Sequence, residues 1–152
     1  MPDSDWDEML AAATGEVLET MFFTGIYGAA PVGESSAGPH TAARLSFEGT
    51  PSGVLTLSVA APAARALATN FLASEDDEPL TDAQLGSVVC ELANMICGAL
   101  LSRVKSEQHF RLSSPDVLLP ESGPYPSGPP SQSLDLGDGA MEIWLELEPH
   151  AH

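Results

Sequence analysis

The spacing of apolar residues changes three times along this chain, and this pattern limits the folds open to it more than any other feature of the sequence. From Trp6 to about Phe23, apolar residues recur at intervals of three and four, as they do in an amphipathic helix. Between residues 43 and 60 they alternate with polar residues on either side of the turn sequence GTPSG, which predicts a β-hairpin. Helical spacing returns from Pro62 to about Lys105, and alternation follows it. This order favours an α+β domain in which helices cover an antiparallel sheet.

The long third helix has the clearest start signal in the sequence. Thr81 and Gln84 form a capping box, so this helix should begin at Thr81 or Asp82. The predicted elements are, in chain order, a helix capped by Asp5 and ended by Gly25 and Gly28, strands at 43–49 and 53–60, helices at 62–73 and 81–105, strands at 109–114 and 116–119, and a hairpin at 133–149.

The alternation within each strand also assigns its two faces, because a shift of one residue would exchange them. In the last strand, Ile143 and Leu145 should face the helices, whereas Trp144 should lie on the opposite, outward face. There Trp144 is expected either at an interface or simply exposed to solvent. The residues expected on the helix-covered face are Leu45, Phe47, Leu55, Leu57, Ile143 and Leu145.

Length and charge restrict the class of protein. The 152 residues fit one domain, residues 1–152, with surface loops expected at 24–40 and 120–133. Five Lys and Arg against 22 Asp and Glu give a formal net charge of −17, which would repel nucleic acid and anionic membrane surfaces. The acidity fits either plain solubility or a surface adapted to a basic partner.

Several negative features indicate a cytoplasmic protein. The sequence has no apolar run of about 18 residues, and its acidic start is unlike a signal peptide, so neither a membrane span nor export is predicted. Cys90 and Cys97 lie on one helix roughly 10 Å apart, too far for a disulfide, which suits a reducing compartment. The four histidines show no metal-ligand spacing, so no metal site is expected.

A polar stripe runs along the side of the long helix that faces away from its apolar arc. At about 100° per residue, Ser87, Glu91, Asn94 and Gly98 fall within roughly 60° of one another. Glycine inside a helix costs about 1 kcal/mol relative to alanine, so Gly98 indicates that something approaches the backbone closely. A solvated face without function is the simpler alternative, but a small, concave stripe is typical of a docking surface. The predicted apolar arc comprises Leu85, Val88, Val89, Leu92, Met95, Ile96, Ala99 and Leu100.

The sequence ELANMICGAL, residues 91–100, resembles the Glu-x-x-Asn-x-x-x-Gly helix of the CheX/CheC/FliY phosphatase family, most closely its CheX-like members. The segment GEVLETMF of the first helix is similar to those proteins too, and the order of elements agrees across the chain. The resemblance implies removal of the phosphoryl group from the aspartate of CheY or a related receiver domain. It also implies a homodimer joined through sheet edges, with which a final strand that is apolar on both faces is consistent.

By position, the resemblance assigns the catalytic pair to Glu91 and Asn94. The other two residues of the stripe, Ser87 and Gly98, are expected to dock the partner. No cofactor is expected on this chain, because the receiver would supply both a Mg²⁺ and a lysine. A side-chain amide can accept a hydrogen bond from an attacking water, which suits Asn94. A carboxylate that pairs with a lysine is an anchor and not a base, which suits Glu91.

The first helix contains only half of such a pair. Glu16 and Glu19 have the same spacing of three, but family members with two working sites carry Asn at the second position. A carboxylate at Glu19 would place negative charge beside the phosphoryl group, so this half-site is expected to be silent. The alternative for the whole protein is a receiver-binding or scaffold module that keeps the fold without turnover.

Overall fold

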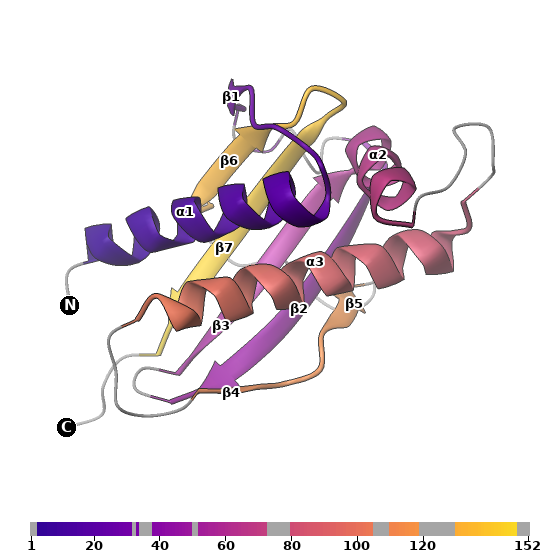
Figure 1. Cartoon of the computed structure of the whole chain (residues 1–152). Helices are drawn as coiled ribbons and strands as arrows, with labels where there is room; N and C mark the ends of the chain where they lie inside the picture. The colour runs from indigo at the N-terminus through magenta and orange to yellow at the C-terminus, as the bar shows by residue number, and fades with distance from the viewer. Residues whose placement is uncertain are drawn as a thin grey trace.

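Three helices lie on one face of an antiparallel sheet in the computed structural model of the chain (Figure 1). The structure describes residues 3–31, 33, 38–49, 52–72, 80–104, 110–118 and 130–148. Its elements are α1 (Asp3–Met21), β1 (Gly28–Ala29), β2 (His40–Glu48), β3 (Gly53–Ala60), α2 (Ala61–Leu72), α3 (Asp82–Ser102), β4 (Arg111–Leu112), β5 (Asp116–Leu118), β6 (Gln132–Asp135) and β7 (Ala140–Leu147).

The sheet confirms the predicted α+β class and both predicted hairpins. Its strands follow the order β1-β6-β7-β3-β2-β4, and β5 also pairs with β2. Leu45 of β2 lies opposite Leu55 of β3, and Leu57 of β3 lies opposite Ile143 of β7, so the apolar faces of the central strands coincide. β7 lies between β3 and β6, but β6 pairs only with its first half, residues 140–143, so within the described residues the second half of β7 has a strand neighbour on one side only.

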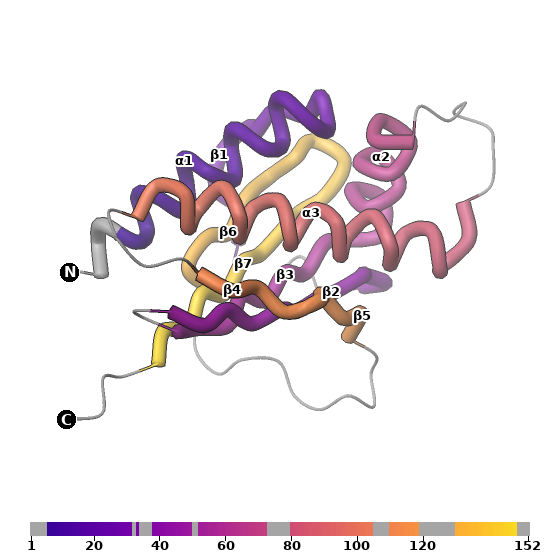
Figure 2. Tube along the Cα trace, turned by 60° about the horizontal axis from the view of Figure 1, so that its bottom comes forward, coloured from indigo at the N-terminus to yellow at the C-terminus, as the bar shows by residue number. Residues whose placement is uncertain are grey.

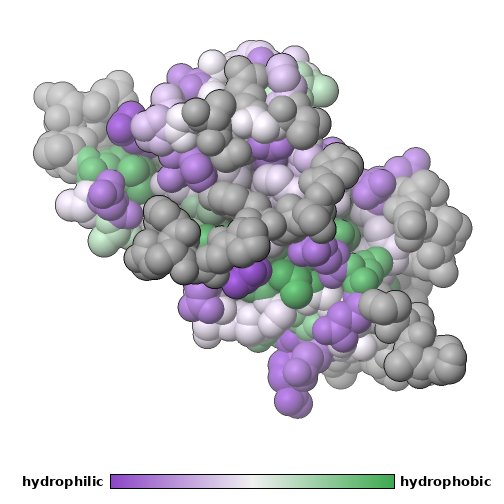
Figure 3. All heavy atoms as spheres, turned by 180° about the vertical axis from the view of Figure 1, so that it is seen from behind, coloured by the Kyte–Doolittle hydropathy of each residue, from purple (hydrophilic) through white to green (hydrophobic). Residues whose placement is uncertain are grey.

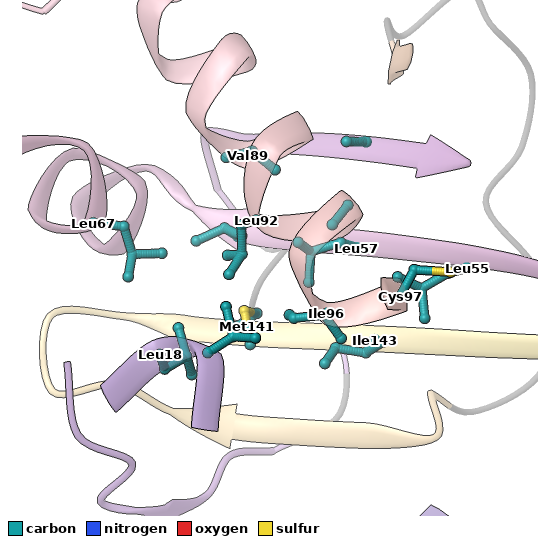
Figure 4. Packing of buried hydrophobic residues seen from close by; sticks show 14 of the residues in the cluster. Leu18, Leu55, Leu57, Leu67, Val89, Leu92, Ile96, Cys97, Met141 and Ile143 are labelled. Atoms are coloured by element: carbon teal, nitrogen blue, oxygen red, sulfur yellow. The ribbon is translucent and has the colours of Figure 1, made fainter. Parts of the chain in front are cut away.

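The core lies between this face of the sheet and the three helices, as Figures 2 and 4 show. Leu92 and Ile96 of α3 and Leu18 of α1 are fully buried there, together with Leu57 and Ile143 from the sheet. Complete burial of one such side chain is worth about 1.5–3 kcal/mol. All six residues predicted on the helix-covered face belong to the core or pack against it, with Leu145 half-buried.

The opposite face of the sheet differs from the prediction, because it is buried at its centre. Trp144 is only 8% exposed, so it is neither an open surface residue nor in need of a second subunit to cover it. Glu142, Thr56 and Ser58 on the same face are also buried, and the Gly33 N–H donates a hydrogen bond to Glu142 Oε2 at 2.9 Å. Alternation distinguishes the two faces of a strand, but it does not reveal how much of the second face is covered. Figure 3 views this rear side of the molecule.

The ends of the helices were predicted unequally well. The Thr81 side chain caps α3, and both hydrogen bonds of the capping box with Gln84 are present, as predicted. The first helix is different, because it begins at Asp3 and leaves Asp5 inside it. It also ends at Met21, well before the predicted glycines, and Phe23 follows in the left-handed region with φ of 53°.

Both predicted surface loops contain strand residues. Gly28 and Ala29 within 24–40 form β1, which pairs with β6, and Gln132 and Ser133 within 120–133 belong to β6. The remainder of the second loop, up to residue 129, lies outside the described residues. These strand segments were not predicted because they are too short to show an alternating pattern in the sequence. They form strands because they pair with a neighbouring strand.

By length and composition alone, α3 is apolar enough to cross a membrane, although the sequence contains no unbroken apolar run. Within the domain, 56% of its apolar window is buried. The hydropathy of this helix is therefore accounted for by its contacts with the sheet and with the two neighbouring helices of the same layer.

Candidate functional site

The polar stripe of α3 faces outward, as predicted. Glu91 and Ser87 are exposed, and Asn94 and Gly98 are half-buried on the same side of the helix. The opposite side carries the buried residues of the core. The sequence therefore placed all four site residues on the correct face, and the helix brings them together as one stripe.

The buried arc itself is rotated by roughly 60° from its predicted position. Ala93 and Cys97 are completely buried, whereas Met95, predicted to be core, is only half-buried. The reason is that α3 contacts α1 and α2 as well as the sheet, so its buried surface extends to one flank.

Gly98 is not required by packing inside the domain. Apart from its own helix backbone, a Cβ atom built at Gly98 would lie within 4 Å of no atom of the described residues, whereas one at Gly86 on the same helix would lie 2.9 Å from Val117 Cγ2. The glycine at position 86 is thus explained by the contact between α3 and β5. Gly98 instead leaves the helix backbone bare one turn beyond Asn94.

Neither member of the predicted catalytic pair is engaged by the part of the chain that the structure describes. Glu91 and Asn94 make no hydrogen bond or ion pair with any described residue. Since a side chain with internal partners must give them up before it binds another molecule, this pair can meet a ligand at little cost.

The corresponding pair on α1 is occupied. Arg103, which caps the C-terminus of α3, donates from Nη2 to Glu16 Oε2 at 2.8 Å and from Nη1 to the Ala99 carbonyl at 3.2 Å. Glu19 is exposed. The half-site that lacks an amide therefore also has its first carboxylate held by an arginine. The sequence did not predict this ion pair, because it joins residues on two helices.

The cysteines beside the motif do not offer a nucleophile at neutral pH. Burial, with smaller contributions from Asp116 and Glu91, raises the pKa of the Cys90 thiol. Burial raises the pKa of Cys97 to about 12. Both thiols are therefore protonated near pH 7, and the thiolate is the reactive form.

Comparison with known proteins adds a family to this geometry. The model of the family described as chemotaxis phosphatase CheX matches residues 41–131, which include the whole of α3 and its stripe. No curated protein matches the sequence.

Solved structures share the fold over nearly the full chain. CheX from Vibrio vulnificus superposes with a TM-score of 0.71 at 17% identity, over 94% of this chain and 96% of that one. CheX from Desulfovibrio desulfuricans gives a TM-score of 0.71 at 18% identity, over 95% and 99%. A chain in a CheX–CheY–BeF3–Mg²⁺ complex from Borrelia burgdorferi gives 0.69 at 15%, over 93% and 97%. At these identities, the likeness establishes the fold alone.

Proposed function

The chain belongs to the CheX family of chemotaxis phosphatases, and from this membership we propose that it hydrolyses the aspartyl phosphate of a CheY-like receiver domain. The observation that supports the proposal most is the unengaged pair of Glu91 and Asn94 on the open side of α3. The Borrelia burgdorferi complex, in which a similarly folded protein is bound to CheY, supports the choice of partner.

Asn94 positions the water in this proposal. Its side-chain oxygen accepts a hydrogen bond from a water molecule and holds it in line with the bond between phosphorus and the aspartate oxygen. The water oxygen attacks phosphorus, the bond to the aspartate breaks, and the aspartate leaves as a carboxylate. The displaced water proton ends on inorganic phosphate. Because Asn94 holds the water in this geometry, less entropy is lost in bringing the water into line during the reaction. This contribution suits a reaction whose phosphoryl group is already activated.

Glu91 anchors the receiver. It lies three residues before Asn94 and is exposed, so its carboxylate can pair with the lysine that a receiver places beside its phosphorylated aspartate. A carboxylate paired in this way has little capacity as a base, and none is required. The Mg²⁺ that neutralises the phosphoryl oxygens belongs to the receiver and not to this chain.

One working site per chain follows from the state of α1. The Glu16 carboxylate is paired with Arg103, and Glu19 offers negative charge where an amide would be needed. Ser87 and Gly98 flank the working pair along α3, and Gly98 leaves room for the receiver to approach the helix backbone.

Phosphate release from the receivers of the same organism tests the proposal. Each receiver is phosphorylated with a small phosphodonor, and its loss of phosphate is followed with and without the protein. Faster loss from at least one receiver is the expected result. Binding of a receiver without faster loss would favour the scaffold alternative, and neither binding nor faster loss would contradict both functions.

A further inference from the structure

The segment that follows α1 presents apolar side chains to solvent. Phe23 and Tyr27 are 75% and 76% exposed, and Met21 and Ile26 are also exposed. Aromatic residues of this exposure are frequent anchors of protein interfaces, because they bury a large area at a low cost in conformational entropy.

The backbone around Phe23 is held in place, so its exposure is not a consequence of a loose end. The Thr24 N–H donates to the Leu18 carbonyl at 2.9 Å, and the Asn70 amide of α2 donates to the Phe22 carbonyl at 3.0 Å. The Phe22 ring stacks on Phe71, with ring centroids 4.8 Å apart. Phe22 is thereby buried while Phe23, next to it, points outward.

Phe23 also adopts a strained conformation. Its φ of 53° lies in the left-handed region, which costs a residue with a Cβ atom roughly 1–2 kcal/mol. Glycine would occupy this position without that cost. Strain that the surrounding structure maintains is a reason to look for a function of the residue concerned.

The contact between α1 and α3 places Phe23 level with the motif. The two helices run in opposite directions, as both Figures 1 and 2 show. Because Arg103 bonds both Glu16 and the Ala99 carbonyl, Glu16 lies level with about residue 99 of α3. Five residues, or about 7.5 Å, further in the same direction, α1 reaches Met21 and α3 returns to Asn94. Phe23 lies two residues beyond Met21, close to the level of Glu91.

We propose that Phe23 is an apolar contact for the receiver domain, beside the Glu91–Asn94 pair; this inference rests on the proposed function. Glu19 and Glu91 present exposed carboxylates near this level, so the surface suits a partner with a cationic site next to an apolar side chain. A receiver with its Mg²⁺ and lysine provides the cationic site. Asn70, the only asparagine of the sequence besides Asn94, holds the Phe23 segment in position.

Phe23→Gly is the direct test, because glycine removes the ring and accepts the left-handed backbone. The probe is the receiver that the wild-type protein dephosphorylates, loaded with beryllium fluoride and Mg²⁺, and its Kd is measured by calorimetry. We expect Phe23→Gly to raise the Kd about tenfold or more, with a melting temperature equal to or above that of the wild type.

Tyr27→Ala is the matched control. Tyr27 is equally exposed on the same segment, but its N–H bonds the Asp135 carbonyl and its ring lies against Gly137, at the β6–β7 turn. Its loss should leave the Kd within about twofold of the wild type.

The outcomes separate this inference from the function on which it rests. If the wild type binds and dephosphorylates the receiver while Phe23→Gly binds equally well, only the inference is overturned. If Phe23→Gly instead converts a dimer to a monomer with unchanged receiver affinity, the residue is a contact between copies and the inference is again wrong. If the wild type binds no receiver, both proposals fail.

Discussion

At the scale of single residues, Arg103 decides what the first helix can do. Its guanidinium joins Glu16 of α1 to the end of α3, and both side chains are partly exposed. Such an ion pair contributes little to stability, about 0–1 kcal/mol. Its consequence for the proposed function is larger, because the carboxylate that would anchor a second receiver is already paired.

Glu19→Ala tests whether that half-site is silent. The substitution removes an exposed side chain that neither contacts the core nor completes an acid–amide pair, so kcat/KM for the receiver should stay within about twofold of the wild type. Steady-state phosphate release measures it. A loss of tenfold or more would assign α1 a direct part in turnover.

Substitutions at Gly98 can test receiver docking without disturbing the packing of the domain. Because a Cβ at Gly98 would meet no atom of the described residues apart from its own helix backbone, Gly98→Ala should raise the free energy of unfolding by up to about 1 kcal/mol. Gly98→Leu should fold equally well but block both receiver binding and turnover, since its side chain fills the stripe. Urea unfolding and a pull-down with the beryllium fluoride-loaded receiver measure the two effects. Normal binding by a folded Gly98→Leu would remove Gly98 from the docking surface.

At the scale of elements, the signals that the sequence revealed are the local ones. The capping box of Thr81 and Gln84 and the turns of both hairpins depend on residues a few positions apart, and all were predicted. The end of α1 was not, because Asn70 and Phe71 of α2 help to define it from a distant part of the chain.

The capping box should be worth a measurable part of the stability of α3. Thr81→Ala removes the oxygen that accepts from the Gln84 N–H at 3.1 Å, so the free energy of unfolding should fall by about 1 kcal/mol. Receiver turnover should be unchanged, because Glu91 and Asn94 lie two or more turns away. Chemical denaturation checks the first outcome, and an unchanged midpoint would contradict it.

The candidate site was predictable for a related reason. Helical periodicity assigns Glu91 and Asn94 to the outward side of α3 once the apolar side is known, and the family resemblance assigns their roles. The partners of α1 and the exposure of Phe23 could not be derived in this way. They depend on how two helices pack against each other, and the spacing of residues along one helix carries no information about that packing.

At the scale of the whole molecule, the second face of the sheet is buried at its centre, where the sequence predicted an outward face. The alternation in β7 placed Ile143 and Trp144 on opposite faces correctly, but both are buried. Glu142, with the Gly33 N–H on its carboxylate, shows that a charged residue type on a strand does not by itself mean an exposed face.

We expect the protein to be a homodimer joined through its sheet edges. Within the described residues, the strands at the edges are β1 on one side and β4 and β5 on the other, each two or three residues long. Pairing through β1 or through β4 and β5 would extend the sheet without disturbing the exposed stripe of α3. Light scattering at micromolar concentration should give twice the mass of one chain, and the mass of a single chain would contradict dimerisation.

The most direct test of the account is single-turnover phosphate release from the phosphorylated receiver, measured with Asn94→Ala in saturating excess over the receiver. In the proposed mechanism Asn94 acts mainly in the transition state, so turnover should fall about a hundredfold or more while the Kd for the beryllium fluoride-loaded receiver changes little. Glu91→Ala, in contrast, should also weaken binding, by about 1–3 kcal/mol for a lost charge-assisted contact. Full turnover by Asn94→Ala would contradict the proposed mechanism.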